Sequence, residues 1–268
     1  MKNERIINVA VAGACGRMGS TIISLLQKTQ DMKAVWIFES KNHPSIGAEV
    51  FPGLIVRDNF EKCPAADVLI DFTTPEATME NIEIATKKKI KAVIGTTGFS
   101  QEHIDKIKSV AKEIPVLVSP NMSIGVNIMM KLVELATTML GKDYEVEIVE
   151  THHHNKKDAP SGTALRIGEI INNVRGKQAR EGFIYGRSGT AGPRTPDEIG
   201  IHAIRISDVV GEHSVMFGGK GEILEISHRC FTREAFAQGA LIAARFIVEK
   251  EKGFYQMADV IDWLKKQS

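Results

Sequence analysis

Short apolar runs alternate with segments of helical spacing through the first 121 residues of the chain. Runs of this kind, bounded by Gly, Pro, Asn or Thr, are typical of strands that are buried on both faces of a parallel sheet. They predict strands at residues 6–14, 32–40, 66–74, 90–98 and 114–121. The segments between them predict helices at residues 20–29, 74–89 and 100–113. Strands that alternate with helices predict crossover connections and a doubly wound parallel sheet.

Two of these helices have recognisable starting residues. Thr74 is suited to the N-cap and Pro75 to the first helical position, while the lysines at 87–89 suit the C-terminal end of the helix dipole. Ser100 is a second candidate N-cap. The residue three positions on is His103, and not the Glu or Gln of a capping box.

The pattern changes after residue 121. A long apolar stretch predicts a helix at 123–141, and EVEIVETH alternates as a strand with one solvated face would over 145–152. A further helix starts near Thr163. Residues 182–200 are rich in Gly, Pro and Arg and predict a loop. Antiparallel strands are predicted at 201–218 and 221–230, and helices at 233–250 and 257–266. This half is therefore expected to form an α+β domain on an open sheet.

Composition narrows the class of protein. The 268 residues are 43% hydrophobic and 25% charged, which excludes disorder, and the net charge of +1 does not indicate a nucleic-acid partner. Three scattered cysteines without a CxxC pair favour a reducing, cytoplasmic location. No apolar run approaches the ~18 residues of a membrane span, and the start of the chain lacks the pattern of a signal peptide.

A glycine-rich turn, GACGRMG, follows the first predicted strand and opens the first helix. Glycines at 13, 16 and 19 would let the backbone approach a pyrophosphate at the helix N-terminus. The G-x-x-G-x-x-G spacing is weak by itself, and a tight turn without a ligand is the alternative. Glu39 ends the second strand at about the ~20-residue offset of an acid that binds a ribose hydroxyl.

Glu39 also bears on which dinucleotide is used. A carboxylate accepts hydrogen bonds from a ribose 2′-hydroxyl but repels a 2′-phosphate, which favours NADH. Arg17 and Lys41 are close enough in sequence to offset that repulsion, so use of NADPH as well stays open. The loops at 95–98 and 119–123 each follow a strand of the same sheet, and are expected to line the nicotinamide site if they are not ordinary turns.

Residues 150–163, ETHHHNKKDAPSGT, gather histidine, lysine and hydroxyl groups. Side chains alternate along a strand, so His152 and His154 would share a face and His153 would point away. There is no HExxH motif or Cys/His ligand spacing, so we do not expect a metal site. A solvated patch is one alternative. Acid chemistry on an anionic substrate fits better, because a histidine and a lysine can supply a proton and a fixed positive charge.

The end of the same stretch favours binding of a carboxylate. Ser161, Gly162 and Thr163 stand at the predicted start of a helix, where N–H groups and hydroxyls can hold an anion. The stretch therefore combines a general acid, a cation and a seat for a carboxylate.

Six segments together resemble the dihydrodipicolinate reductase family: VAGACGRMG, DFTTPE, VIGTTGF, SPNMSIGVN, ETHHHNKKDAPSGTA and GEHSVMF, in this order along the chain. The resemblance implies two catalytic residues, His152 and Lys156, of which the lysine is the family's described proton donor. It implies substrate contacts from His153, Gly162 and Thr163, to which the helix start adds Ser161. It implies cofactor contacts from Gly13, Ala14, Cys15, Gly16, Arg17, Met18, Glu39, Gly95, Thr96, Thr97, Ser119, Pro120, Asn121 and Met122.

The resemblance also implies an architecture and a reaction. A Rossmann-like dinucleotide-binding domain would comprise residues 1–122 and 233–268, and residues 123–232 would bind the substrate and form the oligomer on an open mixed sheet. Family members are typically homotetramers. They reduce the dehydrated form of 4-hydroxy-tetrahydrodipicolinate, a small dicarboxylate, to tetrahydrodipicolinate with NADH or NADPH in lysine and diaminopimelate biosynthesis.

This sequence departs from the pattern of some family members in two places. Ser40 stands where a number of family members carry arginine, and His154 and Asn155 replace other basic residues. We expect domain closure to exclude water, and either His152 or Lys156 to deliver the proton.

Two alternative functions are considered. Another amino-acid-type NAD(P) dehydrogenase is the nearest rival enzyme. A protein that senses NAD(P) without turnover is the rival from another class.

Overall fold

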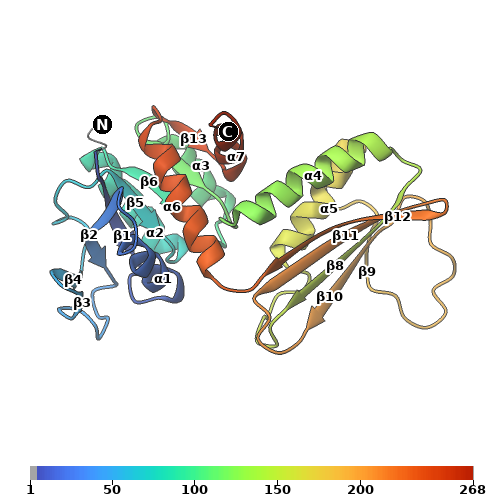
Figure 1. Cartoon of the computed structure of the whole chain (residues 1–268), viewed down its shortest axis with the longest axis horizontal. Helices are drawn as coiled ribbons and strands as arrows, with labels where there is room; N and C mark the ends of the chain where they lie inside the picture. Colours follow the sequence, from blue (N-terminus) through green and yellow to red (C-terminus); the bar gives the residue numbers. More distant parts are fainter. Residues whose placement is uncertain (1–4, 268) are drawn as a thin grey trace. The chain divides into compact units, whose positions relative to one another are not determined.

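The computed structural model describes residues 5–267, which divide into two compact units (Figure 1). The first unit contains the chain up to Ile124 and again from Arg233 onward, and the second is Gly125–Thr232. The chain therefore leaves the first unit and returns to it. The outer limits expected for the first domain, residues 1 and 268, lie outside the described residues.

The first unit is built on an eight-stranded sheet in the order β13-β7-β6-β5-β1-β2-β4-β3. Its strands are β1 (Ile7–Ala12), β2 (Met32–Phe38), β3 (Glu49–Phe51), β4 (Leu54–Arg57), β5 (Val68–Asp71), β6 (Lys91–Ile94), β7 (Pro115–Val118) and β13 (Gly253–Tyr255). Neighbours from β13 to β4 pair in parallel, and β3 pairs antiparallel with β4 at the edge. The order reverses between β1 and β5, which confirms the predicted doubly wound sheet.

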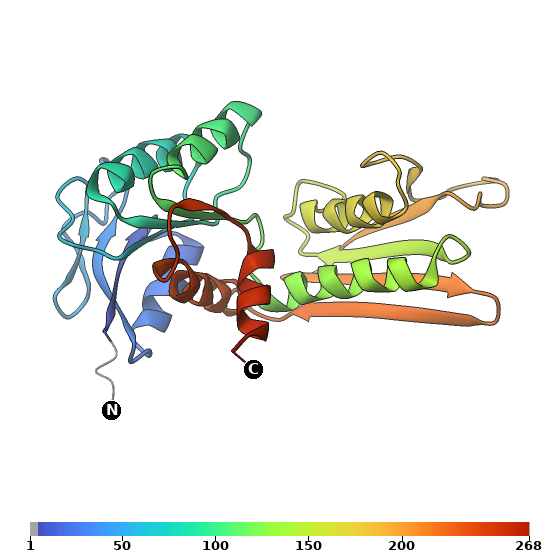
Figure 2. The same cartoon turned by 90° about the horizontal axis from the view of Figure 1, so that it is seen from above.

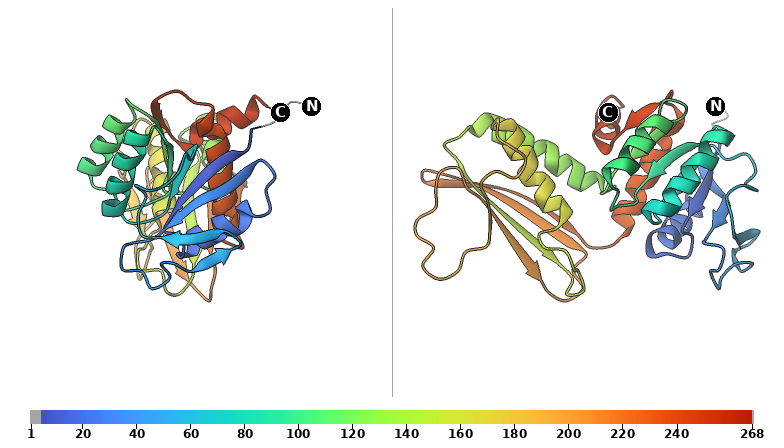
Figure 3. Two further views of the ribbon diagram at one scale, coloured as in Figure 1. Left: turned by 90° about the vertical axis from the view of Figure 1, so that its left-hand side faces the viewer. Right: turned by 180° about the vertical axis from the view of Figure 1, so that it is seen from behind.

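Helices cover both faces of this sheet. They are α1 (Arg17–Leu26), α2 (Pro75–Lys88), α3 (Gln101–Val110), α6 (Glu234–Val248) and α7 (Met257–Lys265). Ile22 of α1 and Ala240 of α6 belong to one apolar cluster, whereas Ile82 of α2 and Ile107 of α3 belong to another. Figure 3 shows the two pairs of helices on opposite sides of the sheet. Strands buried from both sides explain the nearly continuous apolar runs in this part of the sequence.

The first residues of three helices can be compared with the starts predicted from the sequence. Thr74 Oγ1 accepts a hydrogen bond from Ala77 N (3.4 Å) and proline occupies the first turn of α2, as predicted. Ser100 forms a complete capping box with His103, whose Nδ1 accepts from Ser100 N (3.3 Å), so a histidine performs the role expected of Glu or Gln. Helix α1 begins at Arg17 and not at residue 20, since the glycine turn continues directly into it.

The second unit is a five-stranded sheet, ordered β12-β11-β8-β10-β9, with two helices packed on it. Its strands are β8 (Glu145–His152), β9 (Phe183–Tyr185), β10 (Ile199–Arg205), β11 (Gly211–Gly219) and β12 (Glu222–Cys230). Its helices are α4 (Ile124–Leu140) and α5 (Gly162–Val174). Met129 and Val133 of α4 share one apolar core with Ile167 and Ile171 of α5, so both helices cover the same face (Figure 1).

The segment predicted as a single strand at 201–218 is in fact two strands. β10 ends at Arg205 and β11 begins at Gly211. β10 pairs in parallel with β8, whereas only β11 and β12 form the predicted antiparallel hairpin (Figure 2). The physical reason is the connection: α5 lies between β8 and β10 in the chain, and a helical crossover returns a strand in parallel. The expected loop at 182–200 also contains β9.

None of the helices within residues 5–267 has both the length and the apolar character that crossing a membrane requires.

Candidate functional site

The glycine turn has the geometry that a close approach of backbone requires. Gly13 has φ +67°, a conformation that L side chains rarely adopt. A Cβ on Gly19 would lie 2.1 Å from the carbonyl oxygen of Gly13, so α1 packs directly on the turn. Gly16 is the N-cap of α1, and no side chain among the described residues caps it. The N–H groups at the start of α1 are thus available to an anion, as in a dinucleotide-binding turn.

Glu39 lies against this turn, directly after β2. Its Oε1 accepts a hydrogen bond from the backbone N–H of Cys15 (2.8 Å). Ala14 is buried and donates its N–H to Phe38 O (3.2 Å), which joins the turn to the end of β2. Arg17 is exposed at the start of α1. Met18, beside it, is half-buried and packs on the apolar core. A carboxylate expected to bind a ribose is therefore held next to the expected pyrophosphate turn.

Cys15, Glu39 and His43 bring three potential metal donors within 4.8 Å of one another. Two of the three side chains already accept hydrogen bonds: Glu39 Oε1 from Cys15 N, and His43 Nδ1 from Ser45 N (3.2 Å). We assign no metal to this cluster.

A buried carboxylate, Asp71, joins two neighbouring loops at this edge of the sheet. It ends β5 with no exposed surface and accepts from Thr73 N (3.0 Å), Thr73 Oγ1 (2.6 Å) and Asn81 Nδ2 (2.9 Å). Thr96 Oγ1, in the loop after β6, accepts from Thr73 N (3.0 Å) and Thr78 Oγ1 (2.9 Å). Burial raises the pKa of Asp71, although these hydrogen bonds oppose the rise. This network, which positions the expected nicotinamide loop, was not predicted from the sequence.

The loops after β6 and β7 complete the same edge. A Cβ on Gly95 would lie 2.1 Å from the Phe72 ring, so that ring requires a glycine beneath it. Thr97 is exposed, next to buried Thr96. Ser119 donates its N–H to Ile94 O (3.0 Å) and its hydroxyl to the carbonyl of Asn121 (2.8 Å). Pro120 is exposed and Met122 is buried. The structure therefore brings the expected cofactor residues to the carboxyl ends of adjacent strands.

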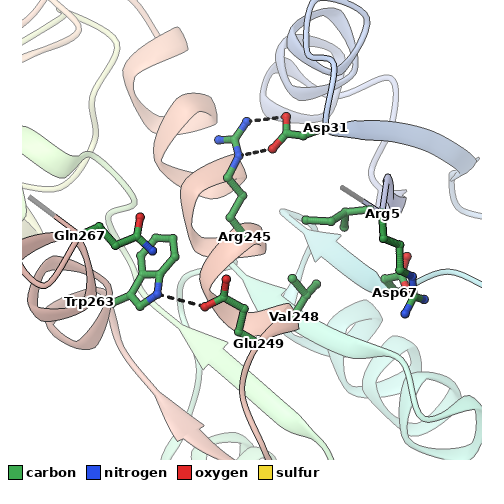
Figure 4. Close-up of a pocket in the computed structure, with 9 residues that line it drawn as sticks. Arg5, Asp31, Asp67, Arg245, Val248, Glu249, Trp263 and Gln267 are labelled. Atoms are coloured by element: carbon green, nitrogen blue, oxygen red, sulfur yellow. Dashed lines mark hydrogen bonds and ion pairs between the residues drawn. The ribbon is translucent and has the colours of Figure 1, made fainter. Parts of the chain in front are cut away.

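A cavity of about 470 Å³ lies at the opposite edge of the sheet. Its lining includes Ile7, Asp31 and Asp67, which stand at the amino ends of β1, β2 and β5. Figure 4 shows its charged groups already paired, with Arg245 on Asp31 and the Trp263 indole on Glu249. Ligands of open α/β sheets bind at the carboxyl ends, so we assign no function to this cavity.

In the second unit, Glu150 and His152 share the buried face of β8, where burial alternates along the strand. Glu150 has no exposed surface, and His152 Nδ1 lies 2.5 Å from its Oε2. Arg205, beside His152 in the register of β8 and β10, bonds both carboxylate oxygens of Glu150 (2.9 and 2.8 Å). Burial by itself would raise the Glu150 pKa, but bonds from His152 and Arg205 outweigh burial and lower that pKa to about 2.

A second histidine, His213 of β11, packs against the first. Its ring lies edge-on to His152, with centroids 5.2 Å apart, and its Nε2 is 3.0 Å from Ser161 Oγ. His213 is 4% exposed. Burial, reinforced by the proximity of His152, lowers the pKa of His213 to about 3. His213 is therefore neutral at pH 7.

The start of α5 adjoins the same group. Ser161 is the N-cap, with Oγ accepting from Ala164 N (3.2 Å), and its own N–H donates to Glu150 Oε1 (3.0 Å). Gly162 and Thr163 form the first residues of α5. The structure therefore places the expected seat for a carboxylate directly beside the Glu150–His152 pair.

Lys156 lies in the turn between β8 and α5. Its Nζ is 2.8 Å from Asp158 Oδ1, and a fifth of its side chain is exposed. The predicted alternation of the three histidines is wrong beyond His152, because β8 ends there. His154 is exposed in the following turn, where its Nδ1 lies 2.7 Å from Ser207 O, and His153 is half-buried.

Three residues of this site were missed by the sequence analysis: Glu150, Arg205 and His213. Glu150 had a readable signal, because it lies two residues before His152 on the same face of a strand. Arg205 and His213 stand 55 and 52 residues from the groups they contact, Glu150 and Ser161. Only the pairing of β10 and β11 with β8 brings them close.

Comparisons with known proteins cover both units. Residues 7–122 match the family model described as dihydrodipicolinate reductase, N-terminus, and residues 125–261 match its C-terminus. The 4-hydroxy-tetrahydrodipicolinate reductase of Methanocaldococcus jannaschii is 46% identical over 270 residues, covering 96% of this chain and 97% of that protein. The reductase of the same name from Syntrophus aciditrophicus is 43% identical, covering 96% and 98%.

A solved structure agrees with the sequence relatives. Dihydrodipicolinate reductase from Paenisporosarcina sp. TG-14, solved with dipicolinate bound, has a TM-score of 0.76 to this chain and is 28% identical. The match covers 94% of this chain and 97% of that one. These similarities extend over both units, as the order of the six sequence segments predicted. The chain belongs to the dihydrodipicolinate reductase family and is an oxidoreductase.

Proposed function

We propose that this protein reduces the dehydrated form of 4-hydroxy-tetrahydrodipicolinate to tetrahydrodipicolinate with NADH or NADPH, a step of lysine and diaminopimelate biosynthesis. The observation that carries the proposal is the group in the second unit. A buried Glu150–His152 pair adjoins the N-terminus of α5, and Lys156 lies in the connection between β8 and α5, where it pairs with Asp158. The names of the relatives support the same reaction.

The substrate is a dianion, and the second unit offers two positive features to bind it. Lys156 supplies a full charge, which Asp158 partly neutralises. The start of α5 supplies N–H groups and the positive end of a helix dipole at Ser161, Gly162 and Thr163. We propose that these groups hold the two carboxylates and that His153 provides a further contact.

Reduction adds a hydride and a proton to the dihydropyridine ring. The reduced nicotinamide supplies the hydride when it is bound. The enamine-like anion that forms on the substrate then takes a proton from His152 or Lys156. His152 is fixed by Glu150, and Lys156 also stabilises the developing anion by its charge.

The first unit fits a nicotinamide dinucleotide on its own geometry. The turn at Gly13, Gly16 and Gly19 packs against α1 more closely than a Cβ on Gly19 would allow, and Glu39 stands beside it. We propose that Glu39 favours NADH by binding the ribose hydroxyls. Exposed Arg17 and Lys41 permit NADPH at lower affinity, because they offset repulsion of a 2′-phosphate.

We further propose a homotetramer in the cytoplasm. Strand β12 is a nine-residue edge strand of the second sheet, and Ile223 is 68% exposed on it. Long exposed edge strands pair readily with other chains. Leu135 and Met139 are also exposed along α4. Light scattering coupled to size-exclusion chromatography tests the proposal: four times the chain mass supports it, and a monomer contradicts it.

A coupled assay tests the reaction. Aspartate semialdehyde and pyruvate are condensed by the synthase that precedes this step, and the loss of reduced-nicotinamide absorbance is followed with NADH and with NADPH in turn. Oxidation that depends on the synthase supports the proposal, and the two rates rank the cofactors. Bound NADH without oxidation would instead support another dehydrogenase or a nucleotide-sensing protein. His152→Gln serves as the inactive control.

A further inference from the structure

Glu150 is a charged group of the second unit with no exposed surface. Each of its two carboxylate oxygens has two partners. Oε1 accepts hydrogen bonds from Ser161 N (3.0 Å) and Arg205 Nη2 (2.8 Å). Oε2 accepts from Arg205 Nη1 (2.9 Å) and meets His152 Nδ1 (2.5 Å). A carboxylate offers about four acceptor sites, so this one is saturated. A substrate would find no acceptor position left on it.

Arg205 offsets the free-energy cost of burying this carboxylate. An isolated buried charge is strongly unfavourable, whereas a bidentate guanidinium neutralises it and matches its geometry. Arg205 is held in turn, because its Nη2 donates to Asp158 O (2.7 Å) and its Nη1 to Ile204 O (2.8 Å). The same hydrogen bonds place Asp158, the partner of Lys156, within this arrangement.

The charge state of Glu150 decides which nitrogen of His152 carries a proton. An ionised carboxylate only accepts hydrogen bonds, so His152 Nδ1 must be the N–H that donates to it. Nε2 is then the position at which His152 releases or takes up a proton. That atom lies beside Gly211, where a Cβ would stand 3.1 Å from it. The ring is thus fixed in both tautomer and direction.

Glu150 also sets the position of the expected carboxylate seat. Its bond to Ser161 N reaches the residue that caps α5, and Ser161 Oγ holds Ala164 N at the first turn. One carboxylate therefore fixes the distance between the proton-transferring histidine and the start of the helix.

We propose that Glu150, clamped by Arg205, is a positioning residue for reduction: it holds His152 with Nδ1 protonated and Nε2 toward the substrate, and it anchors the start of α5. This inference rests on the proposed function. Glu150 acts through His152 and Ser161 and touches neither substrate nor cofactor.

The chain supplies a matched control on the other face of the same strand. Glu147 also accepts a bidentate arginine, Arg187 (3.1 and 2.9 Å), and meets a histidine, His202 Nε2 (2.7 Å). This second Glu–Arg–His cluster is partly exposed and shares no residue with the proposed site. A purely structural role for Glu150 predicts similar consequences when either glutamate is neutralised.

The first experiment observes His152 directly, in the full-length enzyme labelled with ¹⁵N-histidine and free of substrate. The wild type is expected to show a protonated Nδ1 bonded to a carboxylate, and Glu150→Gln to show a loss of that bond or the opposite tautomer. Glu147→Gln should leave the His152 signals unchanged. Unaltered signals in Glu150→Gln would overturn the proposal, whether or not the protein proves to be a reductase.

The second experiment separates turnover from binding. Glu150→Gln is expected to lower kcat by about 10²- to 10⁴-fold, the range seen when a histidine loses its orienting carboxylate or a general acid is impaired. The KM for NADH should change little, and affinity for dipicolinate should fall by about tenfold, since one hydrogen bond at the helix start is worth about 1.4 kcal/mol. Equal losses of kcat in Glu150→Gln and Glu147→Gln would contradict a positioning role.

A double variant keeps the proposal testable if Glu150→Gln alone does not fold. Glu150→Gln leaves the partly buried Arg205 guanidinium without its carboxylate partner, which is destabilising, whereas Glu150→Gln with Arg205→Met removes both charges together. The double variant is expected to fold, to bind NADH and to lack turnover. A folded double variant with wild-type kcat would overturn the proposal.

Discussion

In the first unit, the residues expected to hold the cofactor contribute mainly backbone, whereas in the second unit the proposed substrate site is built beside a cluster of buried charged side chains. The glycine turn depends on the absence of Cβ atoms at Gly13 and Gly19 and on the helix end at Gly16. The site around Glu150 depends on an ionised carboxylate and a bidentate arginine. The glycine turn requires positions without Cβ atoms, whereas the site around Glu150 requires that its buried charges be paired.

The two sites should tolerate different kinds of substitution. A backbone site is damaged by added volume and is little affected by changes in nearby exposed side chains. A buried charged site is damaged by the removal of any single partner, because the remaining charge is left uncompensated. Substitutions that add volume should therefore damage the cofactor site most, and substitutions that remove one charged group should damage the substrate site most.

The largest expected effect is on turnover in the second unit. His152→Gln and Lys156→Ala should each lower kcat by at least ~10²-fold, the usual effect of losing a general acid or its supporting charge. The dissociation constant for NADH, measured by calorimetry, should stay within about twofold of the wild type. Small losses of kcat in both variants would place the chemistry elsewhere.

The next effect is on cofactor binding in the first unit. Gly19→Ala places a Cβ 2.1 Å from Gly13 O, so the turn must move. Overpacking of this kind costs about 1–3 kcal/mol, and if the turn must adopt its present form to bind the cofactor, NADH affinity should fall by about 5- to 140-fold in a fluorescence titration. Gly218→Ala is the control, since nothing lies within 4 Å of its added Cβ. Equal affinities in the two variants would contradict the role of the turn.

A smaller effect concerns the choice of cofactor. Glu39→Ala removes the carboxylate beside the turn and should shift the ratio of NADH to NADPH efficiency by about tenfold toward NADPH, the worth of one charged contact at a partly exposed site. The measurement is kcat/KM with each cofactor. An unchanged ratio would make Glu39 a surface residue with no part in cofactor choice.

The smallest effect is on stability. The unfolded chain protonates His213 near its ordinary pKa of 6.5, but the folded chain does so only at about 3. The unfolded state therefore binds more protons between these values, and stability falls as the pH drops below 6.5, by at most about 1.4 kcal/mol per pH unit. His228, whose pKa burial also lowers, adds to the same slope.

Urea unfolding at several pH values from 7 to 5 measures this slope. His213→Gln should reduce it, while replacement of the exposed His154 by Gln controls for the loss of one histidine. Glu150 contributes little change in this window, because the pKa of its carboxyl is about 2 in the folded state and near its ordinary value of 4.5 in the unfolded state, both below pH 5. A slope that is the same in His213→Gln and the wild type would contradict the assignment.

The comparison also explains what could be predicted from the sequence. The glycine turn, Glu39 and the capped start of α2 are local features, and each was predicted from residues close in the chain. Strand β8 was predicted with its observed limits because its alternation is regular. The short strands β3, β4 and β13 were missed, since three or four residues carry too little periodicity.

The substrate side was harder for a physical reason. Parallel pairing of β10 with β8 is decided by a crossover through α5, and it alone places Arg205 against Glu150. The turn after His152 also depends on contact with Ser207, far along the chain. The residue types of the site were visible in the sequence, but their pairing required the tertiary structure.

The most direct test of this account is a crossed binding experiment on two variants. NADH and dipicolinate are each titrated into Gly19→Ala and Lys156→Ala by calorimetry. We expect Gly19→Ala to weaken NADH binding and to leave dipicolinate binding unchanged, whereas Lys156→Ala should weaken dipicolinate binding and leave NADH binding unchanged. If each variant weakened both ligands equally, the assignment of cofactor to one unit and substrate to the other would be contradicted.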